Sequence, residues 1–152
     1  MAALAYVVLY FVFGYYVAWR NPAVTAYYQG TDPGTLWGQL QAVLRDTPWL
    51  PLVQWLRGLV WTVLGVTVLR SMDGSLLERS LAVAALFAIV MNATLLLPNP
   101  YMPYDVRMVH LVETASSNFL FGLVVAWLFS VPRRPRSCRA VAPPGNAACG
   151  RP

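Results

Sequence analysis

Charge is scarce in this 152-residue chain, and lysine is absent altogether. Only 11% of the residues are charged and 58% are hydrophobic, whereas about a quarter of a soluble domain is charged. This composition argues against an ordinary soluble domain and predicts a membrane protein. All eleven basic residues are Arg, a codon-usage sign of a GC-rich, bacterial source.

The basic and cysteine residues predict no nucleic-acid or metal site. Five of the eleven Arg follow the last apolar run, and none alternates with aromatics on a soluble face. Cys138 and Cys149 lie in the same tail without a nearby His, so we expect free thiols. The tail, 132–152, is rich in Arg, Pro and Ala and should be disordered. We expect no cofactor, and as partners the lipid bilayer and a homo-oligomer or larger membrane assembly.

Four apolar stretches within residues 1–131 predict an all-α, integral membrane four-helix bundle. The stretch 2–19 has no charge and ends in aromatics typical of a membrane interface, not in the small residues of a signal-peptide cleavage site. The other spans are expected at about 51–69, 80–97 and 108–131, since about 20 residues cross the hydrocarbon core.

Two connectors have recognisable patterns. After a TDPG turn at 31–34, apolar residues recur on one face of a short amphipathic helix. This helix lies either on the membrane surface or over the mouth of the bundle. The connector PNPYMPYD (98–105) has three prolines and should form a stiff, extended cap on the outer side.

The distribution of Arg predicts the orientation in the membrane. The tail and the short loop 70–79 together hold seven Arg, and cytoplasmic loops carry the excess of positive charge. Placing both inside requires an even number of spans. We therefore predict a bacterial inner-membrane protein with both termini in the cytoplasm.

Three predicted spans place polar residues at one depth. Arg57, Asn92 and Glu113 each lie about 8–9 Å from the outer end of their helix, at 1.5 Å per residue. His110 and Ser117 share a face with Glu113, and Gln54 shares one with Arg57. These six residues form the predicted polar cluster, in the outer half of the bundle.

Pairing should offset the free-energy cost of charge in this cluster. Each charge inside a bilayer costs at least about 2.5–3.5 kcal/mol, so we predict an ion pair between Arg57 and Glu113. His110 should contact either Glu113 or Asn92. A metal site is not expected, because His-x-x-Glu occurs once and Glu113 is the only acid within a span.

Three functions are consistent with such a cluster. The first hypothesis is a non-catalytic structural or accessory membrane protein, in which the polar groups hold the helices together. The second is a transporter or binding protein for a small polar or anionic solute, held by Arg57 and His110. The third is an intramembrane enzyme that uses Glu113 as acid or base. A structural cluster should be dry and fully paired, and a site should open outward.

A nine-residue pattern occurs twice in the chain. FVFGYYVAW (11–19) and FLFGLVVAW (119–127) share six positions, and three intervening spans would give the copies opposite orientations, as in inverted-repeat transporters. The flanking residues do not align, so we favour a packing motif that arose twice. In either interpretation Gly14 and Gly122 are candidates for close helix contacts.

Overall fold

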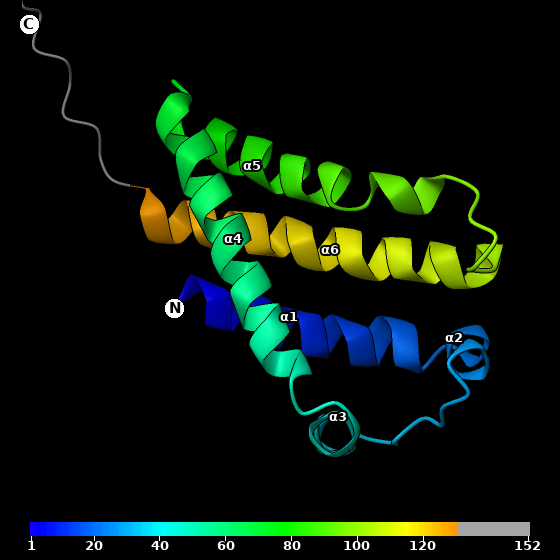
Figure 1. The fold of residues 1–152 in the computed structure, drawn as a ribbon. Coiled ribbons are helices and arrows are strands. Elements are labelled where there is room, and N and C mark those ends of the chain that lie inside the picture. Colours follow the sequence, from blue (N-terminus) through cyan, green and yellow to red (C-terminus); the bar gives the residue numbers. More distant parts are fainter. Residues whose placement is uncertain (131–152) are drawn as a thin grey trace, which may run out of the picture.

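The computed structural model describes residues 1–130, and its regular elements are all helices. In Figure 1, α1 (Ala2–Phe13), α5 (Leu76–Val90) and α6 (Tyr104–Phe129) run alongside one another, and α4 (Leu50–Ser71) crosses them obliquely. The shorter elements are a π-helical continuation of α1, two helices of the first connector and a 3₁₀ turn: η1 (Gly14–Trp19), α2 (Pro22–Tyr27), α3 (Leu36–Asp46) and η2 (Ala93–Leu96). The all-α prediction is confirmed for this part of the chain.

Three helices are long and apolar enough to cross a membrane, namely Ala2–Trp19, Leu50–Ser71 and Tyr104–Phe129. They correspond to the predicted spans 2–19, 51–69 and 108–131. The last of them begins four residues earlier than predicted, in the connector that was expected to be extended up to residue 105. Residues 131–152, with the expected disordered tail and both cysteines, lie outside the described part.

The predicted third span, 80–97, is not one continuous helix in the structure. Helix α5 begins earlier because Ser75 and Glu78 form a capping box: the Ser75 hydroxyl accepts from the Glu78 N–H, and the Glu78 carboxylate accepts from the Ser75 N–H at 2.8 Å. The helix ends at Val90, where the Asn92 carboxamide donates to the Ala88 carbonyl at 2.8 Å. The continuous helix α5 is therefore only fifteen residues long.

The amphipathic helix of the first connector is α3. Its first turn is capped by the Thr35 hydroxyl, which accepts from the Gly38 N–H at 3.0 Å. Figure 1 views α3 end-on, so its axis runs across the long helices. The helix contacts α1 and η1; Gln39 is buried on that side, whereas Trp37 is 65% exposed. α3 therefore packs against the bundle, as one of the two sequence-based alternatives proposed.

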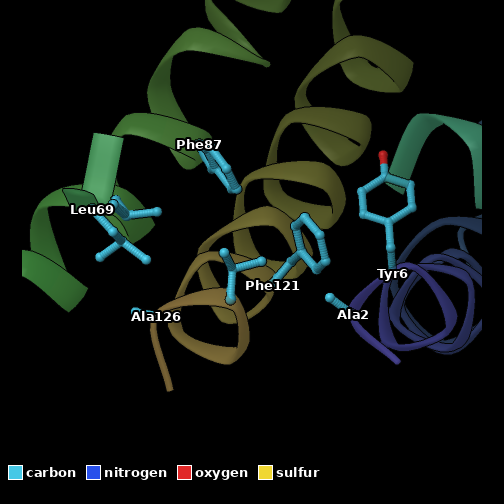
Figure 2. Close-up of a cluster of buried hydrophobic side chains, with 8 residues drawn as sticks. Ala2, Tyr6, Leu69, Phe87, Phe121 and Ala126 are labelled. Carbon is cyan, nitrogen blue, oxygen red and sulfur yellow. The ribbon is translucent and has the colours of Figure 1, made fainter. Parts of the chain in front are cut away.

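The apolar core centres on three aromatic rings from three helices (Figure 2). Phe121 of α6 meets the edge of Tyr6 of α1 at a centroid distance of 4.9 Å and stacks on Phe87 of α5 at 5.8 Å. Leu69 brings α4 to the same cluster. Such aromatic pairs contribute about 0.5–1.5 kcal/mol each beyond the apolar area that they bury.

Glycines allow the closest helix approaches. A Cβ at Gly122 of α6 would lie 2.5 Å from the Cα of Ala84 in α5. A Cβ at Gly58 of α4 would lie 2.8 Å from the Cβ of Tyr6. Both distances are shorter than van der Waals contact, so α5 and α4 reach their neighbours only because these side chains are absent.

We expect Gly122→Ala to destabilise the fold, because the added methyl meets the backbone of α5. Overpacking costs about 1–3 kcal/mol, which should exceed the gain in helix propensity. Gly14→Ala is the matched control, since its Cβ would meet nothing nearer than 3.4 Å. Thermal unfolding in detergent compares the two variants. Equal stabilities would contradict the close packing of α5 on α6.

Candidate functional site

The centre of the candidate site is the carboxylate of Glu113 in α6, a helix long and apolar enough to cross a membrane. The Glu113 residue is only 5% exposed. One turn earlier, His110 places Nδ1 2.7 Å from Glu113 Oε2. Of the two partners that the sequence left open for His110, Glu113 and Asn92, the structure shows the contact with Glu113, which the i, i+3 spacing on one helix face allows.

Tyr28, which follows α2, completes a chain of three side chains. Its hydroxyl lies 3.3 Å from His110 Nε2, and its ring meets the imidazole edge-on at 5.8 Å. Burial, together with the charges of Tyr27 and Glu113, raises the pKa of Tyr28, so the phenol keeps its proton at neutral pH. A neutral His110 protonated on Nδ1 satisfies both contacts, donating to Glu113 and accepting from Tyr28.

A cavity of about 250 Å³ lies beside this chain, between α1 with η1, α3 and α6. His110 and Glu113 form its wall on α6, and Tyr28 contributes from the connector. Helix α3 supplies Gln39 and Val43. The proline-rich connector 98–105 was expected to cap this site, but the lining of the cavity contains no residue of that segment. Helix α3 contributes to the wall instead.

The π-helical segment that begins at Gly14 shapes the wall opposite Glu113. A Cβ at Gly14 would lie 3.4 Å from Glu113 Oε1, so the glycine leaves this oxygen without a covering side chain. Short π-helical segments are rare and occur frequently at functional sites. The segment also turns Tyr15 inward, where it is buried and lines the cavity.

The predicted ion pair between Arg57 and Glu113 is wrong. Arg57 is exposed, and among residues 1–130 its guanidinium lies within ion-pair distance of no carboxylate. The buried stripe of α4 runs through Gln54 and Gly58, which leaves Arg57 at its edge. Arg57 and Glu113 instead line a second cavity of about 30 Å³ with Ser117 and other residues. Its volume suffices for one or two water molecules, which can bridge polar groups that are not in direct contact.

The remaining predicted residues are buried, and among residues 1–130 none of them is hydrogen-bonded to Glu113. Gln54 is 6% exposed, and its Oε1 has no hydrogen-bond partner among the described residues. Asn92 donates to its own helix and not to His110. Ser117 donates to the Thr114 carbonyl at 3.2 Å.

Sequence reasoning missed four polar residues. Tyr28 and Gln39 line the larger cavity, and Asn118, 4% exposed, lines the smaller one. Arg107, assigned to the outer surface, is only 7% exposed, with its guanidinium 5.6 Å from the centre of the Tyr104 ring. The position of Gln39 on the apolar side of α3 was the one available signal, because a polar residue there faces the bundle.

No protein-family model, curated protein or solved structure matches this chain. Among residues 1–130, no group of three or more His, Cys, Asp or Glu side chains could hold a metal ion. Inferences about function therefore depend on the geometry of the two cavities and of Glu113.

Two double-mutant cycles should distinguish the partners of Glu113. We expect His110→Leu and Glu113→Gln to be coupled by about 0.6–1.7 kcal/mol, the range for hydrogen bonds within membranes. Arg57→Gln and Glu113→Gln should show a smaller coupling, because no direct bond joins them. The measurement is the free energy of unfolding in detergent for each single and double variant. A larger coupling for Arg57 than for His110 would refute this arrangement.

Proposed function

We propose that the chain is a small multi-pass integral membrane protein whose helices cross the bilayer four times. Besides the three long apolar helices, α5 together with η2 forms the remaining crossing, which is the third in chain order. η2 continues beside α6 after the break at Asn92 (Figure 1). Helix breaks inside a membrane are tolerated where neighbouring protein covers the backbone, and η2 contacts α6. Exposed apolar residues of α4, such as Val60 and Val63, would face lipid or a second subunit.

The arrangement of the helix ends supports the predicted orientation. The beginning of α1, the end of α6 and the turn between α4 and α5 lie at the same end of the molecule (Figure 1). That turn is flanked by Arg70 and Arg79, and positive charge favours the cytoplasmic side. We place this end in the cytoplasm of a bacterial cell and the two cavities nearer the outer side.

Single cysteines at the two ends test this topology. With Cys138 and Cys149 replaced by Ser, we expect Tyr101→Cys to react with an impermeant maleimide in intact cells. Ser71→Cys should react only after the membrane is opened. Both side chains are exposed. The reverse pattern would invert the orientation. Labelling of both cysteines from one side would rule out the crossing formed by α5 and η2, which separates them.

We further propose that the larger cavity binds a small solute, for transport or sensing. The observation that carries this proposal is a buried carboxylate beside about 250 Å³ of space. Pockets of about 300–1,000 Å³ hold drug-sized ligands, so the occupant here would be smaller. The order of the sequence-based hypotheses changes, with binding now placed before a structural role.

The hydrogen bonds give less support to a structural role. Polar groups that hold a bundle together bond from one helix to another. Asn92, Ser117 and Glu113 instead bond within their own helices, and His110 reaches only the connector residue Tyr28. Removing these groups would break few contacts between the long helices.

The enzyme hypothesis also has less support than binding. Glu113 and His110 could exchange a proton, but covalent catalysis also needs a side-chain nucleophile hydrogen-bonded to one of them. The Ser117 hydroxyl donates to a backbone carbonyl in α6. The Thr47 hydroxyl, in the wall of the larger cavity, donates to the Val43 carbonyl at 3.3 Å.

Filling the cavity should abolish binding without unfolding the protein. We expect some members of a panel of small cationic, anionic and neutral solutes to raise the melting temperature of the detergent-solubilised protein. At 100 times Kd the stabilisation is about 2.7 kcal/mol. Val43→Trp places an indole in the cavity and should remove the effect, whereas Leu44→Trp, at a position 49% exposed, should retain it. If no solute class stabilises the protein, the structural hypothesis returns to first place.

A further inference from the structure

The larger cavity has an aromatic wall. Its rings come from α1, η1 and the connector that follows α2, and they are Tyr10, Phe11, Tyr15, Trp19 and Tyr28. Aromatic faces carry partial negative charge and attract cations placed over them. An enclosure of several rings is how proteins recognise substituted ammonium groups.

The charge in the lining has one sign. Glu113 is the one acidic residue of the lining, and no Arg is part of it. His110 Nδ1 lies 2.7 Å from Oε2, and a neutral imidazole can supply this N–H without adding a positive charge to the lining. Gly14 lies beside Oε1 in the same lining, where a Cβ would be 3.4 Å from that oxygen.

The guanidinium of Arg57 lies on another side of Glu113 than the larger cavity. Arg57 lines the smaller cavity and not the larger one, and it is exposed at the surface of α4. A solute in the larger cavity would therefore meet the carboxylate and the rings before any guanidinium. An anion there would face the carboxylate with no Arg in the lining to compensate its charge.

We propose that the larger cavity binds a small organic cation of the substituted-ammonium class, with Glu113 as its counter-charge and the tyrosine rings as its enclosure. This inference rests on the proposed function as a solute-binding protein and names the class of solute. It takes the place of the sequence-based hypothesis of a small polar or anionic solute held by Arg57 and His110.

The test compares a cation with its uncharged isostere. Choline and tetramethylammonium are titrated into the detergent-solubilised full chain at constant ionic strength, and 3,3-dimethylbutan-1-ol serves as the neutral isostere of choline. Isothermal calorimetry and melting temperature report binding. We expect the cations to bind and the alcohol to bind at least about tenfold more weakly, since it cannot pair with the carboxylate.

Variants separate the two charges. Glu113→Gln should weaken choline binding by at least about tenfold, whereas Arg57→Gln should leave it unchanged or tighten it. If Glu113→Gln does not fold, the pair Tyr10→Phe and Tyr10→Leu decides. Phe retains a ring and should bind, and Leu should lose about 2- to 30-fold in Kd, the range that corresponds to a cation–π contact.

Three outcomes would overturn the assignment. Equal binding of choline and the alcohol would make the cavity a site for neutral solutes. Binding of an anion such as acetate or phosphate that Arg57→Gln abolishes would restore the anionic hypothesis. Either result leaves the proposed solute-binding function intact, whereas the absence of stabilisation by any solute class would refute both proposals.

Discussion

A carboxylate buried in α6, a helix long and apolar enough to cross a membrane, is the constraint around which the residues beside the larger cavity are arranged. Lipid offers no hydrogen-bond donor, and a charge at the centre of a span costs at least about 2.5–3.5 kcal/mol. His110 supplies the donor to Glu113 from the same helix, and Tyr28 holds the imidazole from the connector. The need to satisfy one acid thus ties the polar segment after α1 to the membrane-crossing part of the chain.

Apolar length and helical spacing were enough to predict the elements and contacts that depend on one helix alone. Apolar stretches, together with the length needed to cross a bilayer, predicted α1, α4 and α6, and the i, i+3 spacing placed His110 and Glu113 on one helix face, where they are in contact. The pairing of Arg57 with Glu113 failed because it depends on two helices. Depth along each helix follows from sequence position, but the rotation of α4 and its oblique crossing of α6 follow from packing at Gly58 and Gly65.

The break in the predicted third span and the larger cavity had no clear signal in the sequence. Hydropathy is high throughout 80–97, yet the Asn92 side chain donates to the Ala88 carbonyl, and α5 ends. Such side-chain bonds compete with the backbone ladder without changing hydropathy. The cavity depends on a π-helical turn after Gly14 and on the docking of α3. Apolar periodicity predicts neither a change from α-helix to π-helix nor the position at which a surface helix packs on the other helices.

The repeated pattern F-x-F-G-x-x-V-A-W shows how the same residues acquire different roles. In α6 the glycine lies against the backbone of α5, where a Cβ at Gly122 would meet Ala84 at 2.5 Å. In the first copy the glycine begins a π-helical segment and lies beside the Glu113 carboxylate, where a Cβ would make an ordinary contact of 3.4 Å with Oε1. Copies related by an inverted repeat should occupy equivalent surroundings, and these do not. Of the two glycines, Gly122 alone lies where a side chain would clash with a neighbouring helix, so the likeness is better explained by a pattern that arose twice than by an inverted repeat.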